Sequence, residues 1–314
     1  MSSQLHPLAK RAMPEATLAT QSEQAGDAKR EPAWPIGAML VQAGRLADAD
    51  VQSILEHQQR TGLPFGEAAV ALGLLDMDQV RQVLALQFGQ PALAPDSPLC
   101  QELAAVVDPD SAAVEQLRAV RSQLMLRWFE NDEGQGALAV LSPGAGEGRS
   151  WIAANLAVLF AQLGKRTILI DADLRNPRQH CIFGLPGRVG LSALLAGRAG
   201  MELVTEIRDV PHLSLLPAGA VPPNPQELLA RPGFERLISA LRSNYEVILV
   251  DTPAAEASAD AATIAARAGA ALMVAFRDRS SVPRLAALCD DLRQFGVNVV
   301  GAVLNGVPER GGWR

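Results

Sequence analysis

The chain has 314 residues, a formal net charge of −6 and a sequence pI near 5.3. Its length suits one α/β domain of about 200 residues with a smaller domain beside it, and the acidic balance argues against a nucleic-acid-binding protein, which usually carries a basic face. The longest apolar runs fall far short of the roughly 20 residues that cross a membrane, and the first residues lack the apolar core of a signal peptide, so we expect a cytoplasmic protein.

The three cysteines, Cys100, Cys181 and Cys289, stand alone in the sequence. Their odd number and their lack of ligand spacing argue against a disulfide framework or a zinc site. Inert or buried thiols are the favoured interpretation, because a free cysteine usually behaves as a small core residue.

The N-terminal third divides into a tail and a repeat. Residues 1–33 have no periodic apolar pattern and predict a disordered tail. Two units of 24 residues follow at an offset of 29: PIGAMLVQAGRLADADVQSILEHQ over 35–58 and PFGEAAVALGLLDMDQVRQVLALQ over 64–87. Each predicts a short helix stopped by a glycine, Gly44 or Gly73, then a turn and a second helix. A small all-helical domain is therefore expected over 34–95, its two units packed against each other.

The rest of the chain alternates strands and helices. A Pro-, Ala- and Asp-rich linker is predicted over 96–110, followed by a helix over about 111–130. Strands are then expected at 137–142, 166–171, 213–219, 246–251, 271–276 and 298–304, with helices at 150–163, 190–196, 225–242, 259–267 and 283–295. Aliphatic strands alternating with amphipathic helices predict an α/β domain over 111–314, with a mostly parallel sheet covered by helices on both faces.

A glycine-rich loop, SPGAGEGRS over 142–150, follows the first of these strands and opens into a helix. Its glycines let successive backbone N–H groups turn toward a ligand, and the helix N-terminus adds its positive end, so the loop suits a polyphosphate. The residues expected to bind it are Gly144, Gly146, Glu147, Gly148 and Arg149 in the loop, with Ser150 and Trp151 at the start of the helix.

Carboxylates end two further strands, in ILIDADLR over 168–175 and VILVDTP over 247–253. Ligands of a parallel sheet bind where the strands end, so Asp171 and Asp251 are expected to hold Mg²⁺ together with the Ser150 hydroxyl. Asp171, Asp173 and Arg149 are the candidate catalytic residues for phosphoryl transfer. Arg175 is a candidate phosphate contact, and Asn305 is a candidate for facing an adenine. Taken singly, an Asp or Asn at a strand end is more often a turn or helix cap.

Several motifs in order resemble one family over about residues 108–305. SPGAGEGRS, ILIDADLRNPRQH, GLSALLAG, LPAGAVPPNPQELL, NYEVILVDTPA and GAVLN are similar to the nucleotide-binding domain of bacterial tyrosine autokinases of capsule and exopolysaccharide synthesis, especially the stand-alone chain-length-determinant kinases. The resemblance implies a P-loop NTPase-like fold, ATP with Mg²⁺ and autophosphorylation on tyrosine. It also implies a membrane polysaccharide co-polymerase as partner, which would hold the protein at the inner membrane.

The resemblance extends to the predicted helix over 111–130. Glu115, Arg118 and Arg121 match the family's E-x-x-R-x-x-R motif, which implies a homo-oligomer in which these residues pack against a neighbouring subunit. Without the resemblance, the same spacing is typical of an ion pair on a solvated helix face. A partitioning ATPase of the same fold would explain neither this helix nor PPNPQELL.

Two departures from the family leave two functions open. Arg149 stands where the family has Lys, and its planar guanidinium is not a compact point charge; Ala145 stands where the family usually has Pro. The chain ends in GVPERGGWR without the family's tyrosine cluster, and its one tyrosine, Tyr245, precedes a strand. One interpretation is an ATP-dependent protein-tyrosine kinase that regulates exopolysaccharide chain length, polymerisation and export. The other is a catalytically weakened regulatory subunit that controls a polysaccharide co-polymerase by its nucleotide state.

The helical repeat resembles the tandem motifs of the N-terminal domain of type II secretion and pilus ATPases. Some of those domains bind cyclic di-GMP with an arginine at the start of each motif. Pro35 and Pro64 occupy these positions here, which favours a helical docking module for a partner over a cyclic di-GMP site.

Overall fold

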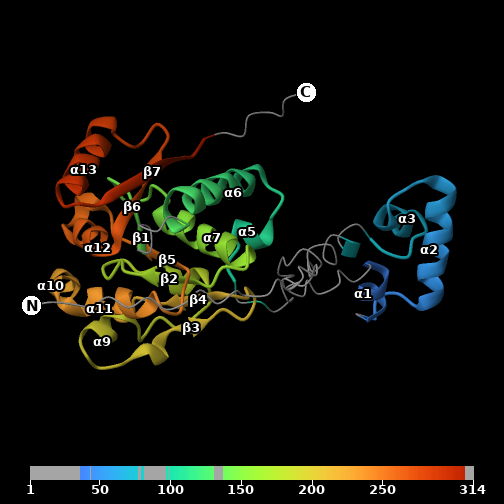
Figure 1. Cartoon of the computed structure of the whole chain (residues 1–314), viewed down its shortest axis with the longest axis horizontal. Helices are drawn as coiled ribbons and strands as arrows, with labels where there is room; N and C mark the ends of the chain where they lie inside the picture. The colour runs from blue at the N-terminus through green and yellow to red at the C-terminus, as the bar shows by residue number, and fades with distance from the viewer. Residues whose placement is uncertain are drawn as a thin grey trace, which may run out of the picture.

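The computed structural model describes residues 36–42, 44–76, 79–80, 97, 99–130 and 137–307 (Figure 1). The tail predicted over 1–33, the motif-opening Pro35 and most of the second helix of the second repeat lie outside these residues. Over the described ranges, no helix combines the length and apolar character needed to traverse a bilayer.

The N-terminal helices α1 (Ile36–Gln42), α2 (Asp48–Thr61) and α3 (Phe65–Ala71) enclose a small core of their own. Its buried residues are Leu40, Leu46, Ile54, Ala68, Ala69, Leu75 and Val80. The two sequence repeats share the same backbone geometry: Gly44 and Gly73 both have φ of +67°, the left-handed conformation that ends a helix.

The same repeat explains a second glycine in each unit. A Cβ on Gly37 would lie 3.0 Å from a methyl of Val51, and a Cβ on Gly66 would lie 2.5 Å from the matching methyl of Val80. Each valine lies 14 positions after its glycine. Glycine is therefore required where the two helices of a unit approach most closely.

The larger domain is built on a seven-stranded sheet of order β3-β4-β2-β5-β1-β6-β7. The strands are β1 (Ala137–Leu141), β2 (Thr167–Asp171), β3 (Thr205–Glu206), β4 (Leu213–Leu216), β5 (Val247–Asp251), β6 (Gly269–Phe276) and β7 (Asn298–Asn305). All neighbours pair in parallel except the short edge strand β3. The central strands β1, β2 and β5 are buried throughout, which is why their sequences are mostly aliphatic.

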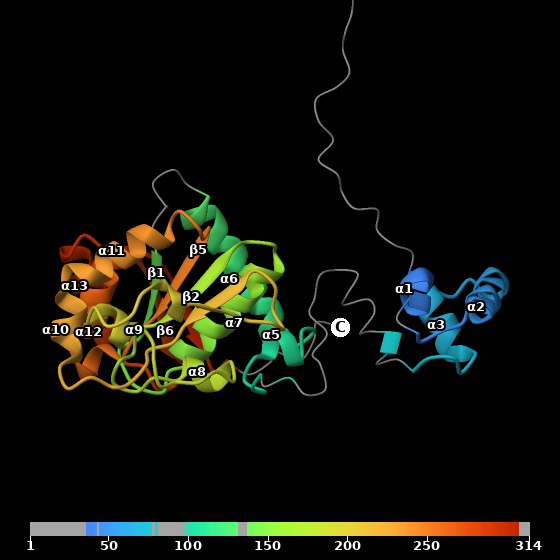
Figure 2. The same cartoon turned by 90° about the horizontal axis from the view of Figure 1, so that it is seen from below.

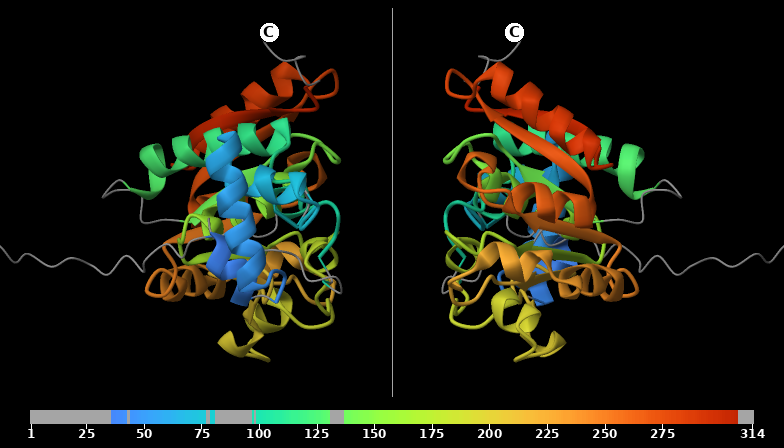
Figure 3. Two further views of the ribbon diagram at one scale, coloured as in Figure 1. Left: turned by 90° about the vertical axis from the view of Figure 1, so that its right-hand side faces the viewer. Right: turned by 90° about the vertical axis from the view of Figure 1, so that its left-hand side faces the viewer.

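Helices cover both faces of this sheet (Figure 2). On one face, α5 (Ala104–Val107), α6 (Ala112–Leu124) and α7 (Arg149–Gln162) pack on Leu138 and Val140 of β1. On the other, α9 (Leu191–Leu195), α10 (Pro225–Ala230), α11 (Pro232–Leu241), α12 (Asp260–Ala268) and α13 (Val282–Gln294) pack on Ala137, Ala139 and Leu141. Figure 3 follows the domain from α13 and β7 (red) at one end to α9 (yellow) at the other. The expected α/β fold is confirmed.

Two predicted segments differ in detail. The helix expected over 225–242 is interrupted at Arg231, whose ψ of 153° is extended, because the residue before a proline, here Pro232, disfavours the helical conformation. Part of the linker predicted over 96–110 belongs to the domain: Leu103 and Ala105 are fully buried, and the Ala105 N–H donates to Oδ1 of Asn155 in α7 at 2.9 Å. The proline and aspartate content of this segment predicted a linker, and the sequence did not show that its apolar residues pack in the core.

Short elements complete the domain. The helix predicted over 111–130 continues past α6 as the π-helical turn η1 (Met125–Phe129). The short helix α8 (Gln179–Ile182) follows β2, η2 (Met201–Leu203) precedes β3, and η3 (Ala255–Ala257) follows β5. Because β2 and β5 pair Asp171 directly with Asp251, α8 and η3 begin at the edge of the sheet where both carboxylates lie.

Candidate functional site

The glycine-rich loop connects β1 to α7 at this edge. Gly146 and Gly148 have φ of +70° and +95°, and Gly148 is the cap of α7. A Cβ on Gly148 would lie 2.1 Å from Nδ2 of Asn305 at the end of β7. Only glycine can adopt this backbone conformation and also leave room for the Asn305 side chain. The loop leads directly into the N-terminus of α7, the positive end of the helix.

The side chain of Arg149 folds back toward the strand ends. Its Nε donates to the carbonyl of Thr252 at 2.8 Å, and its Nη1 donates to the Ser142 hydroxyl at 2.6 Å and to the Gly144 carbonyl at 3.0 Å. The remaining Nη2 lies 3.9 Å from Asp173 Oδ2, and the side chain is 8% exposed. The guanidinium therefore bridges β1, β5 and the turn after β2.

Asp171, Asp251 and Ser150 form the acidic centre of the site. Both carboxyl groups are fully buried. Burial raises the pKa of Asp251 to about 6, against hydrogen bonds from Gln179 and the Ser150 hydroxyl that lower it. Burial and the neighbouring Asp251 raise the pKa of Asp171 well above its ordinary value. Two carboxylates forced together without a fully compensating cation are typical of a site that binds one.

These residues fit Mg²⁺ bound with a nucleotide. Within the residues that the structure describes, the buried Oδ1 of Asp251 has no hydrogen-bond partner, and the Ser150 hydroxyl is close enough to the Asp251 carboxylate to lower its pKa. Among the described residues, no group of three or more His, Cys, Asp or Glu side chains could hold a metal alone. Two carboxylates beside a hydroxyl suit Mg²⁺, which usually takes one or two carboxylates and completes its shell with phosphate oxygens and water.

Gln179 is the site residue that the sequence analysis missed. It is fully buried at the start of α8, and its Nε2 donates to Asp251 Oδ2 at 2.7 Å and to the Ser150 carbonyl at 3.0 Å. Its backbone N–H donates to Asp171 Oδ2 at 3.0 Å. The only sign of its role in the sequence was its position in NPRQH, shortly after the carboxylates of β2. A single glutamine does not predict a binding site.

Asp173 and Arg175 lie in the turn after β2. Oδ1 of Asp173 accepts from the backbone N–H groups of Arg175 at 3.1 Å and Asn176 at 2.9 Å, so this carboxylate shapes the turn while facing Arg149. Arg175, a candidate phosphate contact, pairs instead with the buried Asp260 of α12 through a 2.7 Å bond from Nε. That pairing raises the pKa of the Arg175 guanidinium.

Carboxylates also hold the outer side of the loop. Glu147 accepts from the Gly144 N–H at 2.9 Å and from the Ser280 hydroxyl. Glu256 of η3, another residue not anticipated from the sequence, accepts from the Ala145 N–H at 3.0 Å. The loop N–H groups at 144 and 145 therefore donate to protein carboxylates in this conformation.

Asn305 and Trp151 lie beside a cavity next to the loop. Nδ2 of Asn305 donates to the Glu147 carbonyl at 3.2 Å, so its amide contacts the loop backbone. The cavity has a volume of about 290 Å³, and Gln116, Trp151, Asn305 and Val307 contribute to its lining. An aromatic ring, amides and aliphatic groups in this arrangement suit a flat heterocycle.

The predicted oligomer motif separates into two parts. Glu115 and Arg118 form a 3.0 Å ion pair on the outer surface of α6. Arg121 instead turns inward, and its Nη1 donates to the Leu159 carbonyl near the end of α7 at 3.1 Å. Burial lowers the pKa of the Arg121 guanidinium.

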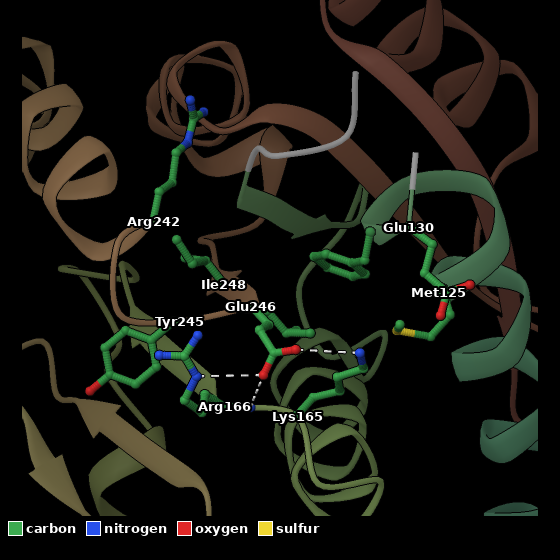
Figure 4. Close-up of a pocket in the computed structure, with 10 residues that line it drawn as sticks. Met125, Glu130, Lys165, Arg166, Arg242, Tyr245, Glu246 and Ile248 are labelled. Carbon is green, nitrogen blue, oxygen red and sulfur yellow. Dashed lines mark hydrogen bonds and ion pairs between the residues drawn. The ribbon is translucent and has the colours of Figure 1, made fainter. Parts of the chain in front are cut away.

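Lys165 and Tyr245 lie at the opposite edge of the sheet, where β2 and β5 begin. Figure 4 shows Lys165 and Arg166 converging on the Glu246 carboxylate, at 3.3 and 3.5 Å, with the ring of Tyr245 beside them. The Tyr245 hydroxyl donates to Ser214 at 3.0 Å. Neither side chain reaches the loop from there, so Lys165 does not replace the lysine that Arg149 displaces.

Comparisons with known proteins agree with this geometry. Residues 138–311 match the family described as the CobQ/CobB/MinD/ParA nucleotide binding domain. The chain is 34% identical over 202 residues to the tyrosine-protein kinase YwqD of Bacillus subtilis, covering 64% of this chain and 84% of YwqD. This protein therefore belongs to the CobQ/CobB/MinD/ParA nucleotide-binding family and, within it, to the bacterial tyrosine-protein kinases, as the motifs implied.

Other relatives extend the comparison. The protein EpsB of Ralstonia solanacearum, whose name describes it as a candidate tyrosine-protein kinase, is 37% identical over 256 residues, which cover 82% of this chain. The chain spans 32% of EpsB, about a third of its length. The solved kinase domain of the Escherichia coli tyrosine kinase ETK superposes with a TM-score of 0.63 at 31% identity, covering 68% of this chain and 82% of that domain. The chimerical protein CapA2B2 gives 0.62, also at 31% identity, over 72% of this chain and 98% of the chimera.

Proposed function

We propose that this protein is an ATP-dependent protein-tyrosine autokinase that regulates exopolysaccharide chain length, polymerisation and export. The observation that carries the proposal is the meeting of Ser150, Asp171 and Asp251 at one edge of the sheet, beside a glycine loop that opens into α7. The names of the relatives support the choice of tyrosine kinase among the reactions such a site can perform.

Each part of the site has a role in this reaction. The loop N–H groups and the start of α7 bind the phosphates, while Trp151 and Asn305 border the cavity suited to adenine. Ser150, Asp171 and Asp251 hold Mg²⁺, which when bound neutralises charge on the phosphates. Asp171 at the end of β2, with Asp173 two positions later, is the proposed general base toward a tyrosine hydroxyl.

The proposed partners follow from the same family. A membrane polysaccharide co-polymerase would hold the protein at the inner membrane, and a homo-oligomer would use the exposed Glu115 and its half-buried partner Arg118. The helices α1–α3 are proposed to dock a partner, with cyclic di-GMP as the less favoured ligand. Calorimetry of the full chain with cyclic di-GMP separates these two roles, because only the second gives heat.

A second function is favoured by Arg149. Three hydrogen bonds tie its guanidinium to Thr252, Ser142 and Gly144, and they oppose movement of the side chain toward a phosphate. A site that binds nucleotide but transfers phosphate slowly would serve a regulatory subunit, which controls a co-polymerase by its nucleotide state.

The experiment is ATP binding and phosphate transfer measured on the same preparation. Calorimetry gives binding, and mass spectrometry after incubation with Mg·ATP gives transfer, both to the protein and to a tyrosine-containing copolymer. Tyr245 is the one tyrosine in the sequence, and its bond to Ser214 at the far edge makes the copolymer the better acceptor. Binding with transfer supports the kinase, binding without transfer supports the regulatory subunit, and absence of binding refutes both.

A further inference from the structure

Gln179 joins the two carboxylates of the site. The backbone N–H groups of Arg178 and Gln179 donate to Asp171 Oδ2 at 3.1 and 3.0 Å, while the Gln179 side chain donates to Asp251 Oδ2 at 2.7 Å. One short segment therefore fixes Asp171 through its backbone and Asp251 through its side chain. Neither carboxylate can turn without breaking a bond to this segment.

The orientation of the Gln179 amide follows from its partners. One end of the amide contacts Asp251 Oδ2 and the Ser150 carbonyl, and both of these atoms are acceptors at neutral pH. That end must be the NH₂ group. The other end is Oε1, which is buried and has no hydrogen-bond partner among the described residues.

A second orphan acceptor lies in the same hydrogen-bonded pair. Oδ1 of Asp251 is also buried without a partner in the described part of the chain. A buried polar atom without a partner is rare and destabilising, because it has lost its hydrogen bonds to water. Two such acceptors on two hydrogen-bonded side chains call for donors or a cation beside them, and the water shell of a bound Mg²⁺ supplies such donors.

We propose that Gln179 is a positioning residue for Mg²⁺ at this site. Its NH₂ group orients Asp251 and the first turn of α7, and its Oε1 supplies, with Asp251 Oδ1, the acceptors that receive the hydrated ion. An amide oxygen beside Asp171 and Asp251 adds an uncharged acceptor without more repulsion between carboxylates. This inference rests on the proposed function, since it concerns the same nucleotide site.

The test measures how much Mg²⁺ strengthens ATP binding. Calorimetry is performed on the full chain with Mg²⁺ and with a chelator, for the wild type, Gln179→Met and the control Gln162→Met. Gln162 is the last residue of α7, the helix that begins at the site. Its Nε2 donates to the Ala105 carbonyl at 3.0 Å. We expect Gln179→Met to lose about tenfold or more of the Mg²⁺-dependent gain, with metal-free ATP affinity changed less than about threefold, and Gln162→Met to match the wild type.

A second variant keeps the test decisive if Gln179→Met does not fold. Gln179→Glu brings a third carboxylate to Asp171 and Asp251, so Mg²⁺ alone should raise its melting temperature more than that of the wild type. A folded Gln179→Met with an undiminished Mg²⁺ gain overturns the inference, and so does a Gln179→Glu protein that Mg²⁺ does not stabilise. If the wild type itself gains nothing from Mg²⁺, the proposed function fails instead.

Discussion

Nε of Arg149 donates to the carbonyl oxygen of Thr252 at 2.8 Å, which joins the residue after the glycine loop to the end of β5. With the bonds from Nη1 to the Ser142 hydroxyl and the Gly144 carbonyl, this contact surrounds the guanidinium with two backbone acceptors and one side-chain acceptor. A planar group with five donors is held by several acceptors at once. Arg149 therefore gives up more protein hydrogen bonds than a lysine would when it turns to bind a phosphate.

Replacing Arg149 by lysine should therefore raise phosphate transfer. A lysine at 149 keeps the charge but has three rotatable donors on a compact head, so it exchanges backbone carbonyls for phosphate oxygens more readily. We expect transfer to the copolymer to increase about tenfold or more, an effect of roughly 1.4 kcal/mol on the barrier. Arg267→Lys, at an arginine paired with Glu235 of α11, is the control. Unchanged binding and transfer in Arg149→Lys would contradict this account of the guanidinium.

Removing the charge of Glu256 should strengthen nucleotide binding. Its Oε1 accepts from the Ala145 N–H at 3.0 Å, and its Oε2 lies 3.2 Å from Arg284. The carboxylate thus stands at the loop where an anionic phosphate must approach, and like charges repel. Glu256→Gln should lower the dissociation constant of Mg·ATP by about threefold to tenfold at low salt, and less at high salt because of screening. Glu235→Gln is the control; weaker binding by Glu256→Gln would exclude a competing role.

Asp251→Asn should stabilise the metal-free protein at alkaline pH. Burial raises the pKa of Asp251 to about 6 in the folded chain, from an ordinary value near 3.8. The protonated form is therefore favoured by folding, and this contribution is present below pH 3.8 and lost as the pH rises through about 6. Urea unfolding with a chelator present should give Asp251→Asn an advantage of about 1–3 kcal/mol at pH 8, shrinking toward pH 5. An advantage that grows as the pH falls would have the wrong sign.

Arg121 and Arg118 should differ in what they stabilise. Arg121→Ala leaves the Leu159 carbonyl of α7 with only the 3.3 Å bond from the Leu163 N–H and removes partly buried side-chain atoms, so we expect a loss of about 1–3 kcal/mol in the free energy of unfolding. Arg118→Ala breaks only an exposed ion pair with Glu115, and the loss should stay within about 0.5 kcal/mol. Denaturation of the monomer at low concentration measures both, and sedimentation at higher concentration shows whether Arg118→Ala weakens a proposed oligomer. Equal losses of stability would contradict the inward role of Arg121.

Much of the fold was readable from local pattern. The nearly continuous aliphatic runs within 166–171 and 246–251 predicted parallel strands, because a strand buried on both faces needs apolar side chains on both. The repeated glycines at 44 and 73 predicted the same turn twice, and both have the same φ of +67°. Such features depend on neighbours along the chain, so the sequence alone contains them.

Other features depended on contacts between distant residues. Leu103 lies in a segment rich in turn-forming residues, and only its packing in the core shows that it belongs to the domain. Arg121 follows the surface periodicity of its motif, yet the position of α7 draws it inward. The sequence offered Arg175 as a candidate phosphate contact, and only the structure shows that Asp260 of α12 is its ion-pair partner.

By itself, the sequence determined that a glycine loop, a hydroxyl and two carboxylates end or follow parallel strands, since backbone conformation and strand burial are set by residue type and spacing. The tertiary structure decided what those groups face. It bonds Arg149 to Thr252 and Gln179 to Asp251, partners more than 70 positions apart in the chain. A side-chain hydrogen bond tolerates a change of only a few tenths of an ångström in the distance between donor and acceptor. Only the packing of the sheet and its helices fixes that distance.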